Sequence, residues 1–70
     1  GRGDLAGAEQ LARLLTTAHP DDPRGWNDLG ILLARAGRPD EAAEIFRQGL
    51  DRLPQDPDLA ANLKRLQGLE

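Results

Sequence analysis

Residues 26–54 read WNDLGILLARAGRPDEAAEIFRQGLDRLP, and this stretch decides the fold class. Its apolar residues recur at spacings of three and four on both sides of Gly37, which is typical of two amphipathic helices. Gly37 and Pro39 predict the break between them, because glycine ends helices in the left-handed conformation and proline suits the first helical turn. The stretch therefore predicts a helix–turn–helix unit.

Two Asp-Pro dipeptides mark further helix starts, at residues 22–23 and 56–57. Aspartate caps a helix by accepting its unpaired N–H groups, and proline lacks an N–H that the first position does not need. Asp4, after Gly3, predicts another start. The expected helices span residues 4–18, 24–36, 39–52 and 57–68. Because the connections are short, neighbouring helices must run antiparallel, and the fold class is all-α.

Composition supports helices and excludes several function classes. The 70 residues include no Ser, Cys, Tyr, Val or Met, while Leu, Ala, Arg, Asp and Glu dominate. Without cysteine there is no disulfide or thiolate site, and we expect no metal and no cofactor. A net charge of −3 argues against nucleic acid and anionic membranes as partners. No apolar run could insert into a membrane, so we expect a soluble protein, cytoplasmic rather than periplasmic.

The sequence repeats itself after 34 residues, the distance between the two Asp-Pro dipeptides. The same shift pairs identical residues at turn and core positions: Gly3 with Gly37, Ala8 with Ala42, Arg13 with Arg47, Pro20 with Pro54, Leu29 with Leu63, and Leu32 with Leu66. A helix–turn–helix period of this length is typical of the tetratricopeptide repeat, whose motif is W-x2-L-G-x2-Y, then A-x3-F, then P.

Residues 23–56 resemble that family closely. The matching signature positions are Trp26, Leu29, Gly30, Leu33 in place of tyrosine, Ala42, Phe46 and Pro54. Gly49 stands where the family usually has alanine. Glycine inside a helix costs about 1 kcal/mol relative to alanine, so Gly30 indicates a close contact between the two helices. The resemblance implies a non-catalytic module that binds a partner protein or peptide.

The resemblance extends over residues 1–70 as a single domain of four helices, with one complete repeat between two half repeats. Residues 1–22 match the second helix of a preceding repeat, and residues 57–70 match the first helix of a following one. Lys64 stands at the position of Gly30, so we expect residues 57–70 to be a terminal capping helix with a polar outer face.

The chain starts at Gly1 without methionine, which indicates an excised or processed piece. Arginine outnumbers lysine eight to one, which indicates a bacterial source.

In this family the first helix of each repeat lines a concave binding face. Those helices here are residues 24–36 and 57–68. The candidate partner-binding residues on them are Arg24, Asn27, Ile31, Arg35, Asn62 and Arg65. Guanidinium and amide donors beside one aliphatic side chain suit an extended acidic or C-terminal peptide. Our leading hypothesis is a protein-interaction module from a larger bacterial scaffold or assembly protein.

Self-association is the alternative hypothesis. The helix at residues 4–18 has no partner helix of its own repeat, and its leucine stripe could form a homodimer. This stripe consists of Ala8, Leu11, Leu15 and Ala18, widened by Leu5, Ala12 and Leu14. A third hypothesis is a regulatory part of an enzyme whose catalytic residues lie outside this chain.

Catalysis within the chain is not expected. His19 is the one histidine, and we interpret it as a residue at the C-terminal end of the first helix, where it faces the helix dipole. Thr16 and Thr17 have no base at a suitable spacing. Arg2-Gly3-Asp4 spells the integrin-recognition tripeptide, but a turn glycine and a helix cap explain it better. Glu9 and Arg13 predict an exposed ion pair at i, i+4.

Overall fold

The computed structural model describes residues 2–68, and their side chains from residue 6 onward. Its helices are α1 (Arg2–Ala18), α2 (Pro23–Arg35), α3 (Pro39–Arg52) and α4 (Pro57–Gln67). No strand occurs within the described residues. The predicted all-α fold of four helices is confirmed, and each predicted helix end lies within two residues of the observed one. None of these helices is long and apolar enough to span a membrane.

Both Asp-Pro dipeptides start helices as predicted. Asp22 precedes α2, and its Oδ1 accepts the backbone N–H of Arg24 at 3.0 Å. Asp56 precedes α4, and its Oδ2 accepts the backbone N–H of Leu59 at 2.9 Å. Gly37 lies between α2 and α3 with φ of +80°, the left-handed conformation that glycine adopts without strain.

The predicted start at Gly3 and Asp4 is wrong. Helix α1 already begins at Arg2, so Gly3 is not a turn residue, and Asp4 lies within the first helical turns. The repeat explains the difference. Pro39 starts α3 because proline disfavours a helical conformation in the residue before it, whereas the equivalent residue in α1 is Leu5. Leucine has no such effect, and the helix continues toward the N-terminus.

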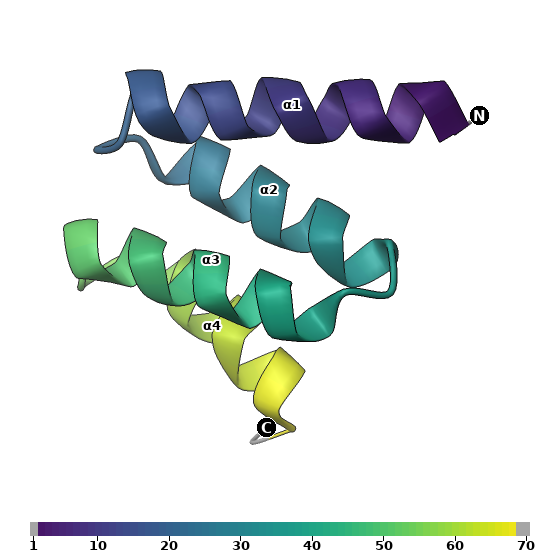
Figure 1. The fold of residues 1–70 in the computed structure, drawn as a ribbon. Coiled ribbons are helices and arrows are strands. Elements are labelled where there is room, and N and C mark those ends of the chain that lie inside the picture. Colours follow the sequence, from purple (N-terminus) through teal and green to yellow (C-terminus); the bar gives the residue numbers. More distant parts are fainter. Residues whose placement is uncertain (1, 69–70) are drawn as a thin grey trace.

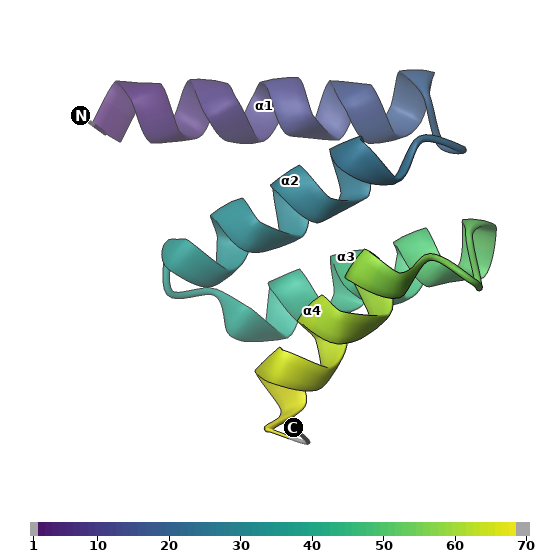
Figure 2. The same cartoon turned by 180° about the vertical axis from the view of Figure 1, so that it is seen from behind.

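The helices run back and forth, as the short connections require. Figure 1 shows α1, α2 and α3 alternating in direction, with α4 behind α3. Figure 2, from the opposite side, shows α2 and α4 running in the same direction. The molecule measures 33 × 27 × 14 Å between Cα atoms. Its shortest dimension fits two helix layers whose axes lie about 8–10 Å apart.

The core lies between α2, α3 and α4. Its most completely buried large side chains are Phe46, Leu29, Leu33 and Leu59. A Cβ added at Gly30 would overlap the ring of Phe46, so the expected close contact of α2 with α3 exists. Glycine at this position is what allows the phenylalanine ring to lie against the backbone of the neighbouring helix.

Helix α1 buries only a narrow side against this core. Ala12 is 6% exposed and Thr16 is 9% exposed. By contrast, Leu11 is 60% exposed and Leu14 is 64% exposed, while Leu15 is 37% exposed. The expected apolar stripe of α1 is therefore largely uncovered in the single chain.

Candidate partner-binding face

All six candidate binding residues lie at two adjoining grooves between α2 and α4. One groove has a volume of about 310 Å³ and the other of about 300 Å³. Ile31, Asn62 and Arg65 line both, while Arg24 and Asn27 line the first and Arg35 lines the second. We call the surface formed by these six residues the α2–α4 face.

A chain of hydrogen bonds crosses this face from α4 to α2. Arg65 donates from Nη1 to Oδ1 of Asn62 at 2.8 Å, and Asn62 donates from Nδ2 to Oδ1 of Asn27 at 2.7 Å. Asn27 in turn donates from Nδ2 to the carbonyl oxygen of Pro23 at 3.1 Å. The side-chain nitrogens of Asn27 and Asn62 each carry two N–H donors, and these hydrogen bonds use one donor on each nitrogen. The face thus presents oriented amides whose remaining donors suit a peptide backbone.

The first groove combines both signs of charge. Asp28 and Asp58 line it together with Arg24 and Arg65. Arg24 already has a partner outside the groove, because its Nη2 lies 2.7 Å from Oδ2 of Asp22. The hydrogen bonds from the Arg24 side chain and backbone lower the pKa of Asp22 to about 2, and the same pair raises the pKa of Arg24. This ion pair directs the Arg24 charge toward its own helix start.

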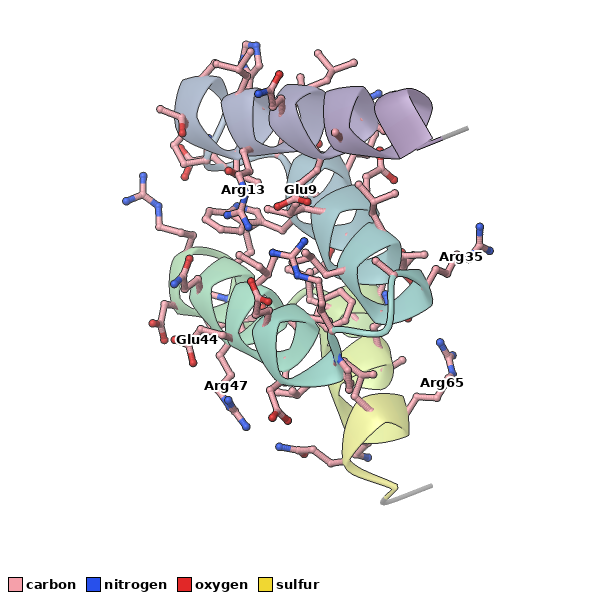
Figure 3. The ribbon with its side chains drawn as sticks, turned by 45° about the vertical axis from the view of Figure 1, so that its right-hand side comes forward. Glu9, Arg13, Arg35, Glu44, Arg47 and Arg65 are labelled. Carbon is pink, nitrogen blue, oxygen red and sulfur yellow. The ribbon has the colours of Figure 1, made fainter. Side chains whose placement is uncertain are left out.

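The second groove is more apolar and has a basic rim. Ala34, Phe46 and Leu66 contribute to its walls beside Ile31. Arg35 and Arg65 project from α2 and α4 toward the same side, one above the other (Figure 3). Two guanidinium groups over apolar walls suit a carboxylate that follows or precedes an aliphatic side chain.

A third groove, of about 350 Å³, lies between α1 and α2. We call it the α1–α2 groove, and its lining residues are Ala8, Leu11, Ala12, Leu15, Asp28, Ile31, Leu32 and Arg35. Sequence reasoning identified the leucine stripe of α1 but did not identify this groove, because the α2 side depends on how the two helices cross.

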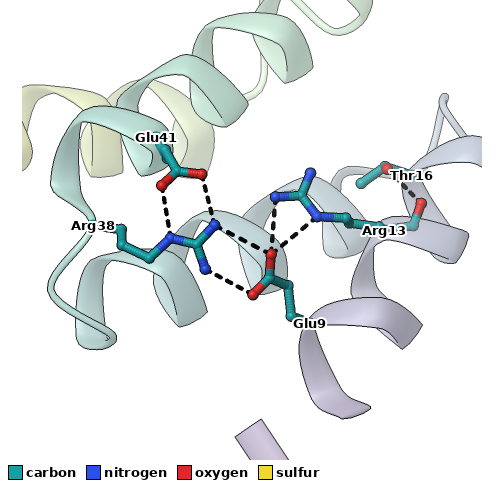
Figure 4. A network of polar contacts seen from close by, with 5 residues as sticks. All are labelled: Glu9, Arg13, Thr16, Arg38 and Glu41. Atoms are coloured by element: carbon teal, nitrogen blue, oxygen red, sulfur yellow. Dashed lines mark hydrogen bonds and ion pairs between the residues drawn. The ribbon is translucent and has the colours of Figure 1, made fainter. Parts of the chain in front are cut away.

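An ion-pair network attaches α1 to the turn between α2 and α3 (Figure 4). Glu9 accepts from Nη1 of Arg38 at 2.8 Å and from Nη2 of Arg13 at 3.0 Å. Arg38 also pairs with Glu41 at 2.7 Å. Hydrogen bonds from Arg38, and then from Arg13, lower the pKa of Glu9, and Arg38 lowers the pKa of Glu41. The predicted Glu9–Arg13 pair is confirmed, and the contact with Arg38 was missed because it joins residues 29 apart.

The residues considered for catalysis lie in the last turns of α1 and just beyond its end. The hydroxyl groups of Thr16 and Thr17 both donate to the carbonyl oxygen of Arg13, at 2.8 and 3.1 Å. His19 is exposed just beyond the end of α1, and its backbone N–H donates to the carbonyl oxygen of Leu15. Among the described side chains, those of residues 6–68, no three His, Cys, Asp or Glu groups lie close enough together to hold a metal ion.

The helix pairs match a known repeat. A sequence model described as the tetratricopeptide repeat matches residues 1–57, which include the whole unit of α2 and α3. The chain belongs to the tetratricopeptide repeat family. No curated protein and no solved structure matched the chain. Tetratricopeptide repeats generally mediate protein–protein interaction and are typically non-catalytic.

Proposed function

We propose that this tetratricopeptide chain is a non-catalytic module that binds an extended peptide on the α2–α4 face. The observation that carries the proposal is the hydrogen-bond chain from Arg65 through Asn62 to Asn27. It holds two amides from two helices in one orientation, between two adjoining grooves. Amides oriented in advance lose little side-chain entropy when a ligand binds, which favours affinity.

The preferred peptide is acidic and carries one aliphatic side chain. Arg35 and Arg65 supply positive charge at the second groove, and Ile31 and Leu66 supply its apolar walls. A carboxylate can accept two hydrogen bonds from one guanidinium group, so a C-terminal or acidic side-chain carboxylate suits this rim.

We assign the repeats as one complete unit at residues 23–56 between half units at 1–22 and 57–70. We further propose that the chain is part of a larger bacterial scaffold or assembly protein, with its bias toward arginine over lysine as the support for a bacterial source.

Peptide binding can be tested with a double substitution, Asn27→Ala with Arg65→Ala. The probes are fluorescein-labelled peptides of mixed Asp, Glu, Leu and Ala sequence, and fluorescence anisotropy reports their affinity. We expect at least about a tenfold loss of affinity, because hydrogen bonds to charged groups contribute about 1.5–3 kcal/mol each. The free energy of unfolding should change by less than about 1 kcal/mol, as at other partly exposed sites.

The matched control is Glu44→Ala with Arg47→Ala. These residues form an exposed pair on α3 with a separation of 3.6 Å, away from Arg35 and Arg65 in Figure 3. Peptide affinity should not change in the control. Chemical-shift changes on α1 and α3, rather than on α2 and α4, would show that the peptide binds elsewhere.

Self-association is a second candidate function, favoured by the 60% and 64% exposure of Leu11 and Leu14. Large apolar side chains uncovered on one helix can pair with another copy. Light scattering coupled to size exclusion measures the mass at rising concentration. Leu11→Glu should then give a helical monomer, and a parent that is monomeric at every concentration would exclude self-association.

A further inference from the structure

The α1–α2 groove has a counterpart one repeat later. Adding 34 to a residue number converts α1 positions into α3 positions and α2 positions into α4 positions. The α1 residues of the groove and their counterparts are Ala8 and Ala42, Leu11 and Ile45, Ala12 and Phe46, and Leu15 and Gly49. All four counterparts are buried. The α1–α2 groove therefore corresponds to the surface of α3 and α4 that α2 covers, and a helix in the orientation of α2 would fit it.

Helix α4 has suitable side chains for docking in the α1–α2 groove. In the new contact, the large residue and the small residue of an equivalent contact inside the chain change places between the two helices. Inside the chain, Gly30 of α2 lies against Phe46 of α3 with no room for a Cβ. At the equivalent positions α4 has Lys64 and α1 has Ala12. The apolar stem of the lysine can lie over the alanine while its ammonium group reaches water. Inside the chain the smaller residue, Gly30, is on α2, whereas in the new contact the smaller residue, Ala12, is on α1.

A second pair shows the same exchange. A Cβ at Gly49 would lie 2.9 Å from Cβ of Trp26, so a glycine in α3 accommodates the tryptophan of α2. The equivalent residues are Leu15 in α1 and Ala60 in α4. A large residue on α1 thus faces a small one on α4. Two independent exchanges of size at neighbouring positions favour α4 as the helix that fits α1.

Charge is complementary as well. Arg24 of α2 and Asp58 of α4 line one groove within the chain. Because Asp58 is the repeat equivalent of Arg24, docking α4 of a second copy beside α2 again places an aspartate near an arginine, with the signs exchanged. Charges of opposite sign across an interface fix its register.

We propose that α4 of one copy docks in the α1–α2 groove of a second copy, so that α4 and the second copy's α1 together form a complete repeat. This proposal rests on the self-association candidate and names its interface. Helices α1 and α4 lie at opposite ends of the molecule in both Figure 1 and Figure 2. The contact is therefore head to tail and leaves one groove and one α4 free, so further copies add in a line.

Mixing two variants of the 70-residue chain tests the proposal. Leu11→Glu blocks the groove and leaves α4 intact, whereas Ala60→Trp blocks α4 and leaves the groove intact. Both positions are exposed in the single chain, so each variant should keep the parent's circular dichroism. Sedimentation velocity should show a parent mass that rises beyond a dimer with concentration. Each variant alone should be monomeric, and their equimolar mixture should form a dimer of about twice 7.6 kDa.

The control is Leu14→Glu. Leu14 is 64% exposed, but its repeat equivalent is the exposed Gln48, so the head-to-tail contact does not use it. Its association should match that of the parent. A parent that dimerises but is unaffected by Ala60→Trp would overturn the head-to-tail contact while leaving self-association intact. A parent that stays monomeric would overturn both and support a polar cap on α4.

Discussion

Trp26 is held at both ends of its side chain. Its Nε1–H donates to the carbonyl oxygen of Pro20 at 2.8 Å, and its Cβ lies over Gly49. The residue as a whole is only 9% exposed. One residue of α2 therefore fixes both the α1–α2 turn and the contact with α3.

Trp26→Ala should cost about 3–5 kcal/mol of unfolding free energy, because it removes a large core side chain and leaves a cavity. A domain of this size has a total stability of only about 5 kcal/mol, so cooperative unfolding should be lost. Thermal melts followed by circular dichroism at 222 nm measure this. A variant that melts like the parent would contradict the packing of the indole.

Gly49→Ala and Gly7→Ala should change stability in opposite directions, although both replace a helical glycine. At Gly7 a Cβ meets nothing within 4 Å, so the helix gains up to about 1 kcal/mol. At Gly49 the Cβ overlaps Trp26, and the strain costs about 1–3 kcal/mol, which outweighs that gain. Urea titrations of the two variants give the sign of each change in stability. Equal shifts of the two unfolding midpoints would refute the close contact of Gly49 with Trp26.

At the scale of elements, α1 has the fewest helix neighbours, because within the described residues it packs against α2 alone. It buries Ala12 and Thr16 in the described structure, and Glu9 connects it to Arg38. An exposed ion pair contributes little by itself, but a carboxylate shared by two guanidinium groups forms a small network. The attachment of α1 should accordingly depend on the charge of Glu9.

Acid should weaken that attachment, and Glu9→Gln should remove part of the pH dependence. The pKa of Glu9 is lower in the folded chain, so its contribution is complete above the unfolded pKa and is lost as pH falls through the folded pKa. The melting temperature of the parent should therefore fall more between pH about 6 and about 3 than that of the variant. Asp22 titrates in both proteins and cancels in the comparison, because its partner is Arg24. Glu41 shares Arg38 with Glu9, so the difference between the two pH curves measures the Glu9–Arg38–Glu41 network as a unit. Parallel pH curves would show that Glu9 contributes nothing.

Local signals in the sequence predicted the elements well, and long-range contacts were harder. Asp22, Asp56 and Pro39 determine helix starts by their own chemistry, so the sequence alone reveals them. The start of α1 was misplaced because Asp4 resembles a cap but lacks a proline after it. The repeat pattern predicts which residues belong to the candidate site. The hydrogen bond from Asn62 to Asn27, by contrast, depends on how α2 and α4 cross. That geometry is not encoded in residue spacing.

At the scale of the whole molecule, the chain exposes more surface than a compact protein of its mass. Its accessible surface is 4704 Å², against roughly 4,300 Å² expected from mass. The excess agrees with a flat stack of helices whose outer ones are covered on one side. Each added helix in such a stack buries surface on both neighbours.

The melting temperature should rise with protein concentration if copies dock head to tail. Association stabilises the folded state by mass action, since only folded chains possess the groove. Ala60→Trp should melt at the same temperature at every concentration. Calorimetry over a hundredfold concentration range makes the comparison, and a parent without any shift would argue against association.

Trp26 also gives the chain an internal optical reporter. It is the one tryptophan, and the sequence has no tyrosine, so excitation at the red edge of protein absorption reaches this indole alone. The ring lies where the α1–α2 turn meets α3, and Leu59 of α4 lies close to the same glycine, Gly49. Its emission should move to longer wavelength whenever any of these contacts opens. Fluorescence without a label can therefore follow the integrity of the repeat in every variant that retains Trp26.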